Sequence, residues 1–420
     1  MKNIGIKILI TISIISLVIF VIIGINYYQS YKVKVHKEKQ TTALKEEEKE
    51  KQRQKLLEEA YNLVKGYYVE EAIELLNKDK SLINDEMSSK IKEYQDYKDS
   101  YVLYDGFIEH IFFHSLILYP EYIFKDITTP TGGFNEGFSY KREIDRMLPL
   151  LLENGFVLYN INDVFGKDDN GIMNKKEIYL PKGKKPLILS IDDPAYANSD
   201  SKYNLGLANR MILDENNELA TEVYTPEKEL ITTYDGDVEL VVNNFVKEHP
   251  EFSYKGAKGI IASTGYLGIF GYDLETDEEK EKATAVANKL KEQGWLFASH
   301  SYTHNRLNHW GPGSDPVRIS NDTKKWKEVI EPIIGKTNIF IAPFGYTLRG
   351  QAMQVIINNG FDIYCSVDSS SEFEVFNDYA LMSRVEMGGY SYSRYKKYLD
   401  THLFEVDKVK DSYRPPVLGS

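Results

Sequence analysis

The feature that most constrains the fold is a repeated unit, in which a helical stretch ends in glycine and an apolar run rich in β-formers follows at once. It occurs four times, as LLENG before FVLYNI, LKEQG before WLFAS, EPIIG before KTNIFIA, and IINNG before FDIYCSV. The glycines that end the helical stretches fit the left-handed position that closes a helix, and they are Gly155, Gly294, Gly335 and Gly360. The short continuous runs after them are typical of parallel strands that are buried on both faces.

Other apolar runs extend this pattern, namely His110 to Leu116, Leu187 to Ile191, Gly259 to Ser263 and Ala380 to Val385. Alternating helix and strand from Asp105 onward predicts an α/β fold with a parallel sheet or barrel. Seven or so strands favour a barrel of the (β/α) kind. A polar insertion between Pro194 and Asp237 contains a predicted hairpin at residues 214–217, in a place where insertions commonly shape substrate grooves.

The N-terminal segment predicts a membrane anchor. Residues Ile8 to Ile25 form an apolar run of 18 without a charge, which is long enough to span a bilayer. No cleavage site of small residues follows, so we expect an uncleaved signal anchor in residues 1–30. Lysines are more numerous after the run than before it, and the positive-inside rule alone would therefore place the N-terminus outside.

Residues 31–104 are charged and helical in period, which predicts a helical stalk or hairpin between the anchor and a domain at 105–420. The segment AYNLVKGYYVEEAIELL resembles one tetratricopeptide unit. A single copy forms no solenoid, because about three repeats are needed. We therefore interpret this region as a spacer.

Composition excludes several classes of function. The net charge of −12 argues against nucleic acid as a partner, because phosphate binding needs clustered Lys and Arg. The glycines of GYLGIFGY do not match a dinucleotide fingerprint, so we expect no nucleotide. Cys365 is the only cysteine, so the chain forms no internal disulfide, and we interpret this residue as a small buried hydrophobe.

Two stretches carry residues of a metal site. In WLFASHSYTH, His300 and His304 are four positions apart and share one face if the backbone is helical there. In PLILSIDDP, Asp193 follows an apolar strand and supplies an oxygen ligand, while its neighbour Asp192 is free to act as a general base. Two nitrogens and one oxygen suit Zn, and would accept Co or Mn. The alternatives are a pair of structural histidines and an acidic pair that caps a helix.

The order SIDDP, HSYTH, IAPFG resembles the polysaccharide deacetylases of carbohydrate esterase family four, the NodB homology domain, from about residue 105 to 416. The resemblance implies a distorted (β/α)7 barrel that removes acetyl groups from chitin-like or peptidoglycan sugars by means of a water that a divalent metal activates. It implies that Asp193, His300 and His304 bind the metal and that Asp192 is the general base. It also implies that Pro343 and Phe344 face the substrate, with the backbone N–H of Phe344 binding the oxyanion.

The chain departs from the family pattern at several positions. Pro194 stands where the first motif usually has Gly, Ile341 where the third motif has the Arg that orients the base, and Phe344 where it has Tyr. The late segment ALMSRVEM lacks the His that protonates the leaving amine.

Other residues of the chain could take the roles of the missing Arg and His, judged by residue type. His309 and His402 are available as proton donors, Arg349 or Arg384 as the partner of Asp192, and Asp368 either assists the base or starts a turn. In HIFFHSL, His110 and His114 alternate with aromatic residues, and we interpret both as structural.

We therefore expect a single-pass membrane protein whose catalytic domain lies outside the cytoplasm, because the predicted chemistry acts on cell-wall polysaccharide. The predicted reaction is deacetylation of N-acetylated wall glycan, with peptidoglycan N-acetylglucosamine as the leading substrate. The alternative is a weak or inactive relative that binds wall glycan or assists wall assembly, and the missing Arg and His motivate it.

Overall fold

The structure is a computed structural model that describes residues 2–124, 132–196, 206–305 and 313–417. The chain divides into two compact units. One comprises Met1–Val64 with Val69–Asp96, and the other comprises Lys65–Tyr68 with Tyr97–Ser420.

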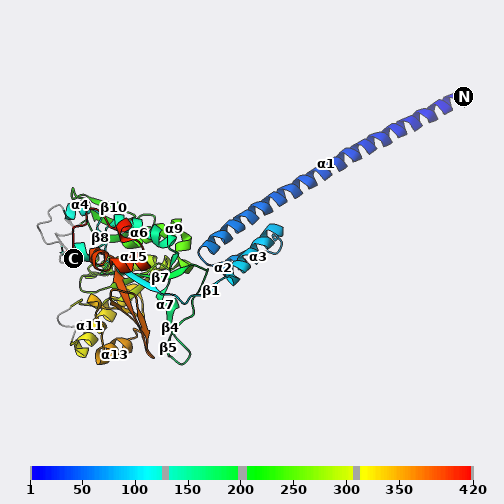
Figure 1. The fold of residues 1–420 in the computed structure, drawn as a ribbon. Helices are drawn as coiled ribbons and strands as arrows, with labels where there is room; N and C mark the ends of the chain where they lie inside the picture. The colour runs from blue at the N-terminus through cyan, green and yellow to red at the C-terminus, as the bar shows by residue number, and fades with distance from the viewer. Residues whose placement is uncertain (1, 125–131, 197–205, 306–312, 418–420) are drawn as a thin grey trace. The chain divides into compact units, whose positions relative to one another are not determined.

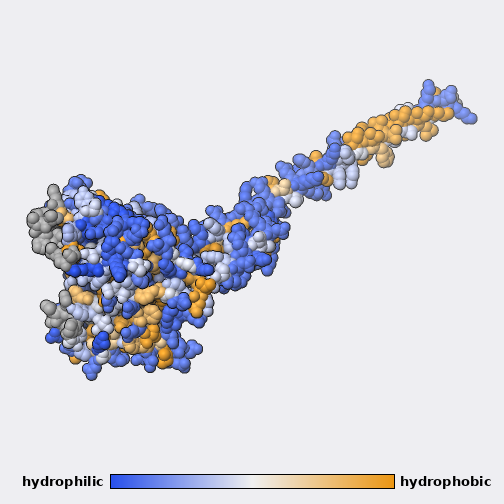
Figure 2. Space-filling view, viewed as in Figure 1, coloured by the Kyte–Doolittle hydropathy of each residue, from blue (hydrophilic) through white to orange (hydrophobic). Residues whose placement is uncertain are grey.

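The first unit consists of three helices, α1 (Lys2–Lys65), α2 (Val69–Asn77) and α3 (Asp85–Asp99). The apolar first part of α1 is exposed and forms a continuous hydrophobic surface, drawn in orange in Figure 2. This helix is long and apolar enough to cross a membrane, although a signal sequence satisfies the same criteria. Arg53 on α1 donates to the carbonyl of Leu82 at 2.8 Å and so ties α1 to the α2–α3 connection.

The second unit contains a closed barrel of seven parallel strands. Its order is β11-β12-β13-β14-β16-β2-β7, and a further pairing of β7 with β11 closes the ring. The strands are β2 (Glu109–Phe113), β7 (Lys185–Asp192), β11 (Ile260–Ser263), β12 (Leu296–Ser299), β13 (Ile339–Ile341), β14 (Ile363–Val367) and β16 (Ala380–Glu386). The predicted (β/α)7 barrel is thereby confirmed.

One of the predicted strands, β3 (Phe156–Leu158), lies outside the ring because it shares an edge of β7 with β11. Strand β3 pairs with the start of β7 at Lys185 to Leu187, and β11 pairs with the end of β7 at Ser190 to Asp192. Because β2 pairs along the other side, β3 and β11 share one edge of β7. Hence β3 is parallel and buried as predicted, but it is not part of the closed barrel.

Helices surround the barrel, with α6 (Lys141–Glu153) and α9 (Val238–Glu248) on one side of the strands and α11 (Pro316–Val329) and α13 (Gly350–Asn358) on the other (Figure 1). A further helix of this unit is α10 (Asp277–Glu292), which lies between β11 and β12 in the chain. All four glycines that we expected to close helices have positive φ, between 83° and 97°. The shorter helices are α4 (Pro120–Ile123), α5 (Gly132–Gly137), α7 (Ile161–Val164), α12 (Glu331–Ile334), α14 (Gly389–Arg394), α15 (Lys396–His402) and α16 (Val406–Val409).

Small sheets extend the barrel. The polar insertion forms an antiparallel sheet of β8 (Ala208–Leu213), β9 (Leu219–Tyr224) and β10 (Leu230–Thr233), and the predicted hairpin at 214–217 is the β8–β9 turn. The remaining strands are β1 (Val102–Leu103), β4 (Phe165–Lys167), β5 (Met173–Lys175), β6 (Tyr179–Leu180) and β15 (Phe373–Val375).

The barrel interior is filled by alternate residues of the strands. Small and branched side chains form one buried cluster, which includes Ile188, Ile260, Ala262, Ala298, Ile341, Ile363, Met382 and the fully buried Cys365. Residues of the opposite parity, such as Leu187 and Leu189, pack outward against the helices. Successive side chains of a strand point to opposite faces. Polar residues that continue the inward-facing series at the carboxyl end of a strand therefore point into the barrel.

Candidate metal centre

Three potential metal ligands meet at the carboxyl ends of β7 and β12. The ligand atoms of Asp193, His300 and His304 all lie within 4.8 Å of one another. Asp193 Oδ2 is 3.5 Å from His304 Nε2 and 3.9 Å from His300 Nε2. Ligands about 2.1 Å from a tetrahedral ion lie roughly 3.4 Å apart, so this donor set fits one divalent ion. Two imidazoles and a carboxylate suit Zn, Co or Mn.

The orientation of His300 is fixed by the barrel backbone. Its Nδ1 lies 2.8 Å from the carbonyl oxygen of Ile341, which only accepts hydrogen bonds. The proton therefore sits on Nδ1, and Nε2 is left for a metal. Ile341 contributes through its main chain, so the absence of a polar side chain at this position does not affect the bond.

The segment between the two histidines is a loop, and our expectation of a helical face is wrong there. Ser301 and His304 have φ of 60° and 46°, which a helix does not permit. The loop is held by the buried carboxylate of Asp322 on α11, which accepts from the backbone N–H groups of Tyr302 at 2.7 Å and Thr303 at 3.0 Å. The hydroxyl of Thr303 donates to it at 2.6 Å. Helix α11 thus places the second histidine.

Asp192 and Asp193 both face the site because the strand pattern is interrupted between them. Consecutive residues of a strand point to opposite faces, but Asp193 has φ of 57°. As a result, His300 Nε2 lies 3.9 Å from Oδ2 of each carboxylate. Positive φ at a residue other than glycine is strained, and it is found here at the proposed ligand.

Asp192 is paired with Arg384 from β16. The guanidinium donates to both carboxylate oxygens, at 2.7 Å and 3.0 Å, and both side chains are buried. Burial alone would raise the pKa of Asp192, but the charge of Arg384, with smaller contributions from His300 and His114, holds this pKa well below its usual value. Asp192 is therefore ionised at neutral pH. The other candidate partner, Arg349, is exposed just before α13.

A second layer of polar residues lies behind this pair. Ser190 Oγ is 3.0 Å from Arg384 Nη1 and 3.0 Å from His110 Nε2. Because arginine only donates, the hydroxyl accepts from Arg384, and it also shares a hydrogen bond with His110. Burial and the charge of Arg384 lower the pKa of His110 well below its ordinary value, so this imidazole is neutral. His110 thus supports Arg384 from inside the barrel.

Our sequence interpretation assigned no functional role to His114, which directly follows β2. Its Nδ1 donates to the carbonyl of Gly137 at 2.9 Å and lies 3.6 Å from a carboxylate oxygen of Glu386. Because Phe113 pairs with Ile191 of β7, His114 lies at the end of the barrel where β7 ends in Asp192. The alternation in HIFFHSL could have indicated this position from the sequence. His110, Phe112 and His114 share one face of the strand, whereas Ile111 and Phe113 pack outward against the helices.

Aromatic side chains border the ligand set. Pro343 is buried, and Phe344 is 47% exposed with its ring centroid 4.4 Å from that of His304. Tyr266 is 51% exposed, and burial together with the charge of Asp193 raises its pKa. The site is thus flanked by apolar surfaces of the kind that stack on sugar rings.

The remaining candidates lie as follows. Asp368 accepts from the backbone N–H of Ser369 at 2.6 Å, as a turn-forming residue does. His402 lies 3.6 Å from Glu109 at the start of β2, which is the opposite end of the barrel from the ligands. His309 lies outside the described residues.

The fold and the site define a seven-stranded parallel β/α barrel that carries an Asp–His–His cluster of metal-ligand geometry at the carboxyl ends of its strands, next to a buried carboxylate–arginine pair. No model of a known protein family matches the chain, and no curated protein matches its sequence.

Several solved structures are similar to this chain. The deacetylase PplD of Streptococcus pyogenes, solved in complex with acetate, is 12% identical with a TM-score of 0.39, and the match covers 69% of this chain and 94% of that one. A de-N-acetylase from Aggregatibacter actinomycetemcomitans is 12% identical with a TM-score of 0.38, over 67% and 95%. IcaB from Ammonifex degensii is 15% identical with a TM-score of 0.37, over 68% and 93%.

Proposed function

We propose that this protein is a metal-dependent deacetylase of N-acetylated cell-wall glycan, with peptidoglycan N-acetylglucosamine as the leading substrate. The observation that carries the proposal is the juxtaposition of a complete donor set, Asp193, His300 and His304, with an ionised carboxylate outside that set, Asp192. When bound, a divalent ion such as Zn supplies a Lewis acid that polarises an acetyl carbonyl and makes water a better nucleophile.

Asp192 acts as the general base in this proposal. Its two oxygens hold about four lone-pair sites, and the bonds from Arg384 use two of them, so a site remains for the proton of the attacking water. Arg384 fixes the carboxylate plane and keeps it ionised. This arginine comes from β16, and it would replace the arginine that is absent at Ile341.

His114 supplies the proton that the leaving amine needs. An amide nitrogen leaves poorly as an anion, so a positioned acid is required. Nδ1 keeps its proton in the bond to Gly137, so the transferred proton is the Nε2 proton of the imidazolium form, and a neutral ring with its proton on Nδ1 remains. The role would therefore pass from the late segment ALMSRVEM to the end of the first barrel strand.

The glycan is bound by the aromatic border of the site. Phe344 and Tyr266 offer exposed ring faces beside His304 and Asp193, and a pyranose ring has apolar C–H faces that pack on aromatic surfaces. The oxyanion role of the Phe344 backbone N–H and the substrate contact of Pro343 belong to the same proposal. Residues 1–30 anchor the chain in the cell membrane, 31–104 act as a stalk, and 105–420 form the catalytic domain outside the cytoplasm.

The test is acetate release by the full-length protein in detergent, loaded with Zn or Co, from peptidoglycan and N-acetylglucosamine oligomers. The matched variant is Asp192→Asn, which removes the base but leaves Asp193, His300 and His304 in place. We expect acetate from the wild type and a loss of roughly 100-fold or more in the variant, with unchanged metal content. A folded protein with one metal per chain that releases no acetate from any N-acetylated glycan refutes the proposal.

One observation favours a second candidate, a glycan-binding protein without turnover. Arg384 holds the pKa of Asp192 far below neutral pH, against the opposing effect of burial, and a carboxylate of such low basicity is a poor base. This candidate predicts that muropeptides bind equally well to the wild type and to Asp192→Asn, with no acetate from either.

A further inference from the structure

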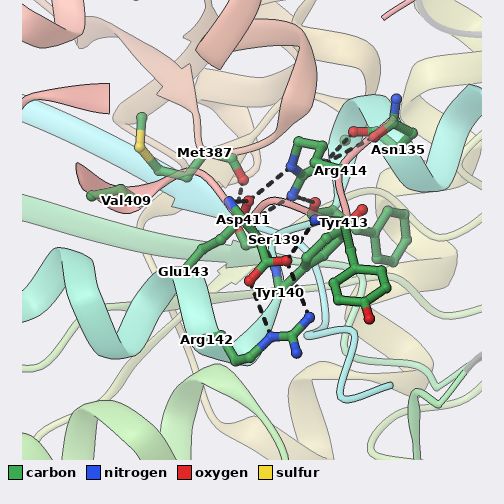
Figure 3. Close-up of polar contacts among 12 residues, drawn as sticks. Asn135, Ser139, Tyr140, Arg142, Glu143, Met387, Val409, Asp411, Tyr413 and Arg414 are labelled. Atoms are coloured by element: carbon green, nitrogen blue, oxygen red, sulfur yellow. Dashed lines mark hydrogen bonds and ion pairs between the residues drawn. The ribbon is translucent and has the colours of Figure 1, made fainter. Parts of the chain in front are cut away.

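Arg414 lies beyond the last barrel strand, near the C-terminus, and its side chain is fully buried. Its Nε donates to Glu143 on α6 at 2.9 Å, and Nη2 also donates to this carboxylate (Figure 3). The guanidinium carbon lies 4.0 Å from the ring centroid of Tyr140 and 5.5 Å from that of Tyr392. Each end of the fork therefore has a fixed partner.

The same guanidinium binds two main-chain carbonyls of the segment 135–139, which comprises the end of the short helix α5 and the two residues after it and is called the loop 135–139 below. Nη1 donates to the carbonyl oxygen of Asn135, and Nη2 donates to that of Phe138 at 2.8 Å. In the other direction, the side-chain amide of Asn135 donates to the carbonyl of Pro415 at 3.0 Å. The C-terminal segment and the loop 135–139 are thus joined in both directions.

The two residues that directly follow β16, Met387 and Gly388, hold this loop from the other side. The hydroxyl of Ser139 donates to the carbonyl of Met387 (Figure 3). A Cβ atom at Gly388 would lie 2.4 Å from the carbonyl oxygen of Glu136, so only glycine permits this approach. The loop has no room to shift toward the barrel.

The loop in turn holds His114. The carbonyl of Gly137, between the two residues that Arg414 binds, accepts the Nδ1 proton of His114 at 2.9 Å. The ring of Phe138 stacks on the imidazole, with centroids 5.2 Å apart and planes 22° from parallel. Asn135, Gly137, Phe138 and Ser139 therefore each contact Arg414, Met387 or His114 through a hydrogen bond or a ring contact.

We infer that Arg414 is a positioning residue for His114: through Asn135 and Phe138 it fixes the loop that orients the imidazole at the barrel mouth. The inference rests on the proposed function for its kinetic consequence, because His114 is the proposed proton donor. A proton donor that is displaced by about 1 Å loses much of its effect.

The test compares two leaving groups. Arg414→Lys keeps the charge but loses the planar fork that reaches Glu143 and both carbonyls at once. For the full-length, metal-loaded protein we expect kcat on an N-acetylglucosamine oligomer to fall by roughly 10- to 100-fold, with KM changed less than about 3-fold. Hydrolysis of 4-nitrophenyl acetate, whose phenolate leaves without a proton, stays within about 3-fold of the wild type.

Arg146→Ala is the matched control. Arg146 lies on the same helix α6 and binds the same C-terminal segment, at Asp411 and at the carbonyl of Val409. Among the described residues, none of its hydrogen bonds reaches residues 135–139. We expect neither reaction to change by more than about 3-fold in this variant. If Arg414→Lys does not fold, Asn135→Ala removes the bond to Pro415 and takes its place.

A second readout needs no activity. Spectra of the full-length protein labelled with ¹⁵N in its histidines, with the His114 signals identified by their loss in His114→Gln, report the Nδ1 hydrogen bond. We expect the Nδ1 signal to move in Arg414→Lys and not in Arg146→Ala. Unchanged His114 signals, or equal losses on the amide and the ester with full metal content, overturn the inference. A wild type that releases no acetate refutes the proposed function instead, and the spectra still decide the role of Arg414.

Discussion

At the scale of single residues, the site depends on a buried charge pair. Asp192 and Arg384 satisfy one another in the barrel interior, and Ser190 and His110 complete the hydrogen bonds behind them. A buried ion pair contributes little net stability over an apolar pair, but removal of one partner leaves an uncompensated charge. The pair is therefore sensitive to single substitutions.

We predict that Arg384→Met destabilises the protein by about 3–5 kcal/mol, because Asp192 is left buried and unpaired. The double variant Arg384→Met with Asp192→Asn should recover at least half of that loss, since no buried charge remains. Urea unfolding of the full chain in detergent, followed by tryptophan fluorescence, measures both. A double variant less stable than Arg384→Met would contradict this account of the pair.

Asp322 also acts on the site indirectly, because it holds the loop between His300 and His304. Three hydrogen bonds from the histidine loop end on its carboxylate. We predict that Asp322→Ala weakens Zn or Co binding by roughly 10- to 100-fold without removing a ligand. Competition with a chelator of known affinity measures the constant, and Asp315→Ala, at the N-cap of the same helix, is the control. Equal affinities in the wild type and Asp322→Ala would show that the loop needs no such support.

At the scale of elements, the sequence predicts what depends on local pattern. Glycine after a helical period marked four helix-to-strand junctions, and the apolar runs marked the barrel strands. Residue type alone offered Arg349 or Arg384 as the partner of Asp192, but it could not choose between them and it assigned no role to His114. Both depend on which strands become neighbours, because β2, β7 and β16 are far apart in the chain but adjacent in the ring.

The histidine pair shows a different limit. Spacing by four residues suggested a helix, but the two rings meet across a loop that α11 fixes. Likewise, β3 had every local property of a barrel strand and was excluded because β11 takes the same edge of β7 further along. In both cases tertiary contacts decide the structure against what the local sequence pattern predicts.

Helix α9 carries a buried acidic pair that makes stability depend on pH. Asp237 caps the helix and Glu239 lies in its first turn, and neither carboxylate oxygen of Glu239 has a hydrogen-bond partner within the described residues. Burial raises the pKa of Asp237 to about 6 and, together with the charge of Asp237, raises that of Glu239 well above its usual value. The folded chain then holds protons that the unfolded chain releases, so stability falls as pH rises through these pKa values.

We predict that Glu239→Gln stabilises the protein by about 1–3 kcal/mol at pH 8 and by much less near pH 4, where the native glutamic acid is already neutral. Asp237 is left intact as the helix cap. Urea unfolding at both pH values, with the buried Trp295 and Trp326 as fluorescent probes, gives the comparison. A gain that is equal at the two pH values would contradict the buried-charge explanation.

At the scale of the whole molecule, the barrel places all proposed ligands at one end, where the carboxyl ends of its strands meet. The buried cluster that fills the barrel interior extends to Phe165 and Met173, which lie outside the seven barrel strands. The apolar first part of α1 is exposed over its whole length.

We predict that deletion of residues 1–30 moves the protein from the membrane fraction to the soluble fraction and leaves acetate release per chain within about 3-fold. The full-length protein should be protected from protease added to sealed spheroplasts only if its domain lies inside. Digestion of the domain in intact spheroplasts is the expected result. A protected domain would contradict the proposed location outside the cytoplasm.

The most direct test of the central claim is a titration of the metal-free, full-length protein with Co or Zn, in which bound metal and acetate released from N-acetylglucosamine oligomers are measured together. The account predicts that acetate release rises in proportion to bound metal and saturates at one ion per chain. It also predicts that His304→Ala neither binds that ion tightly nor releases acetate. Acetate release that is independent of metal, or one tightly bound ion with no acetate, would contradict the account.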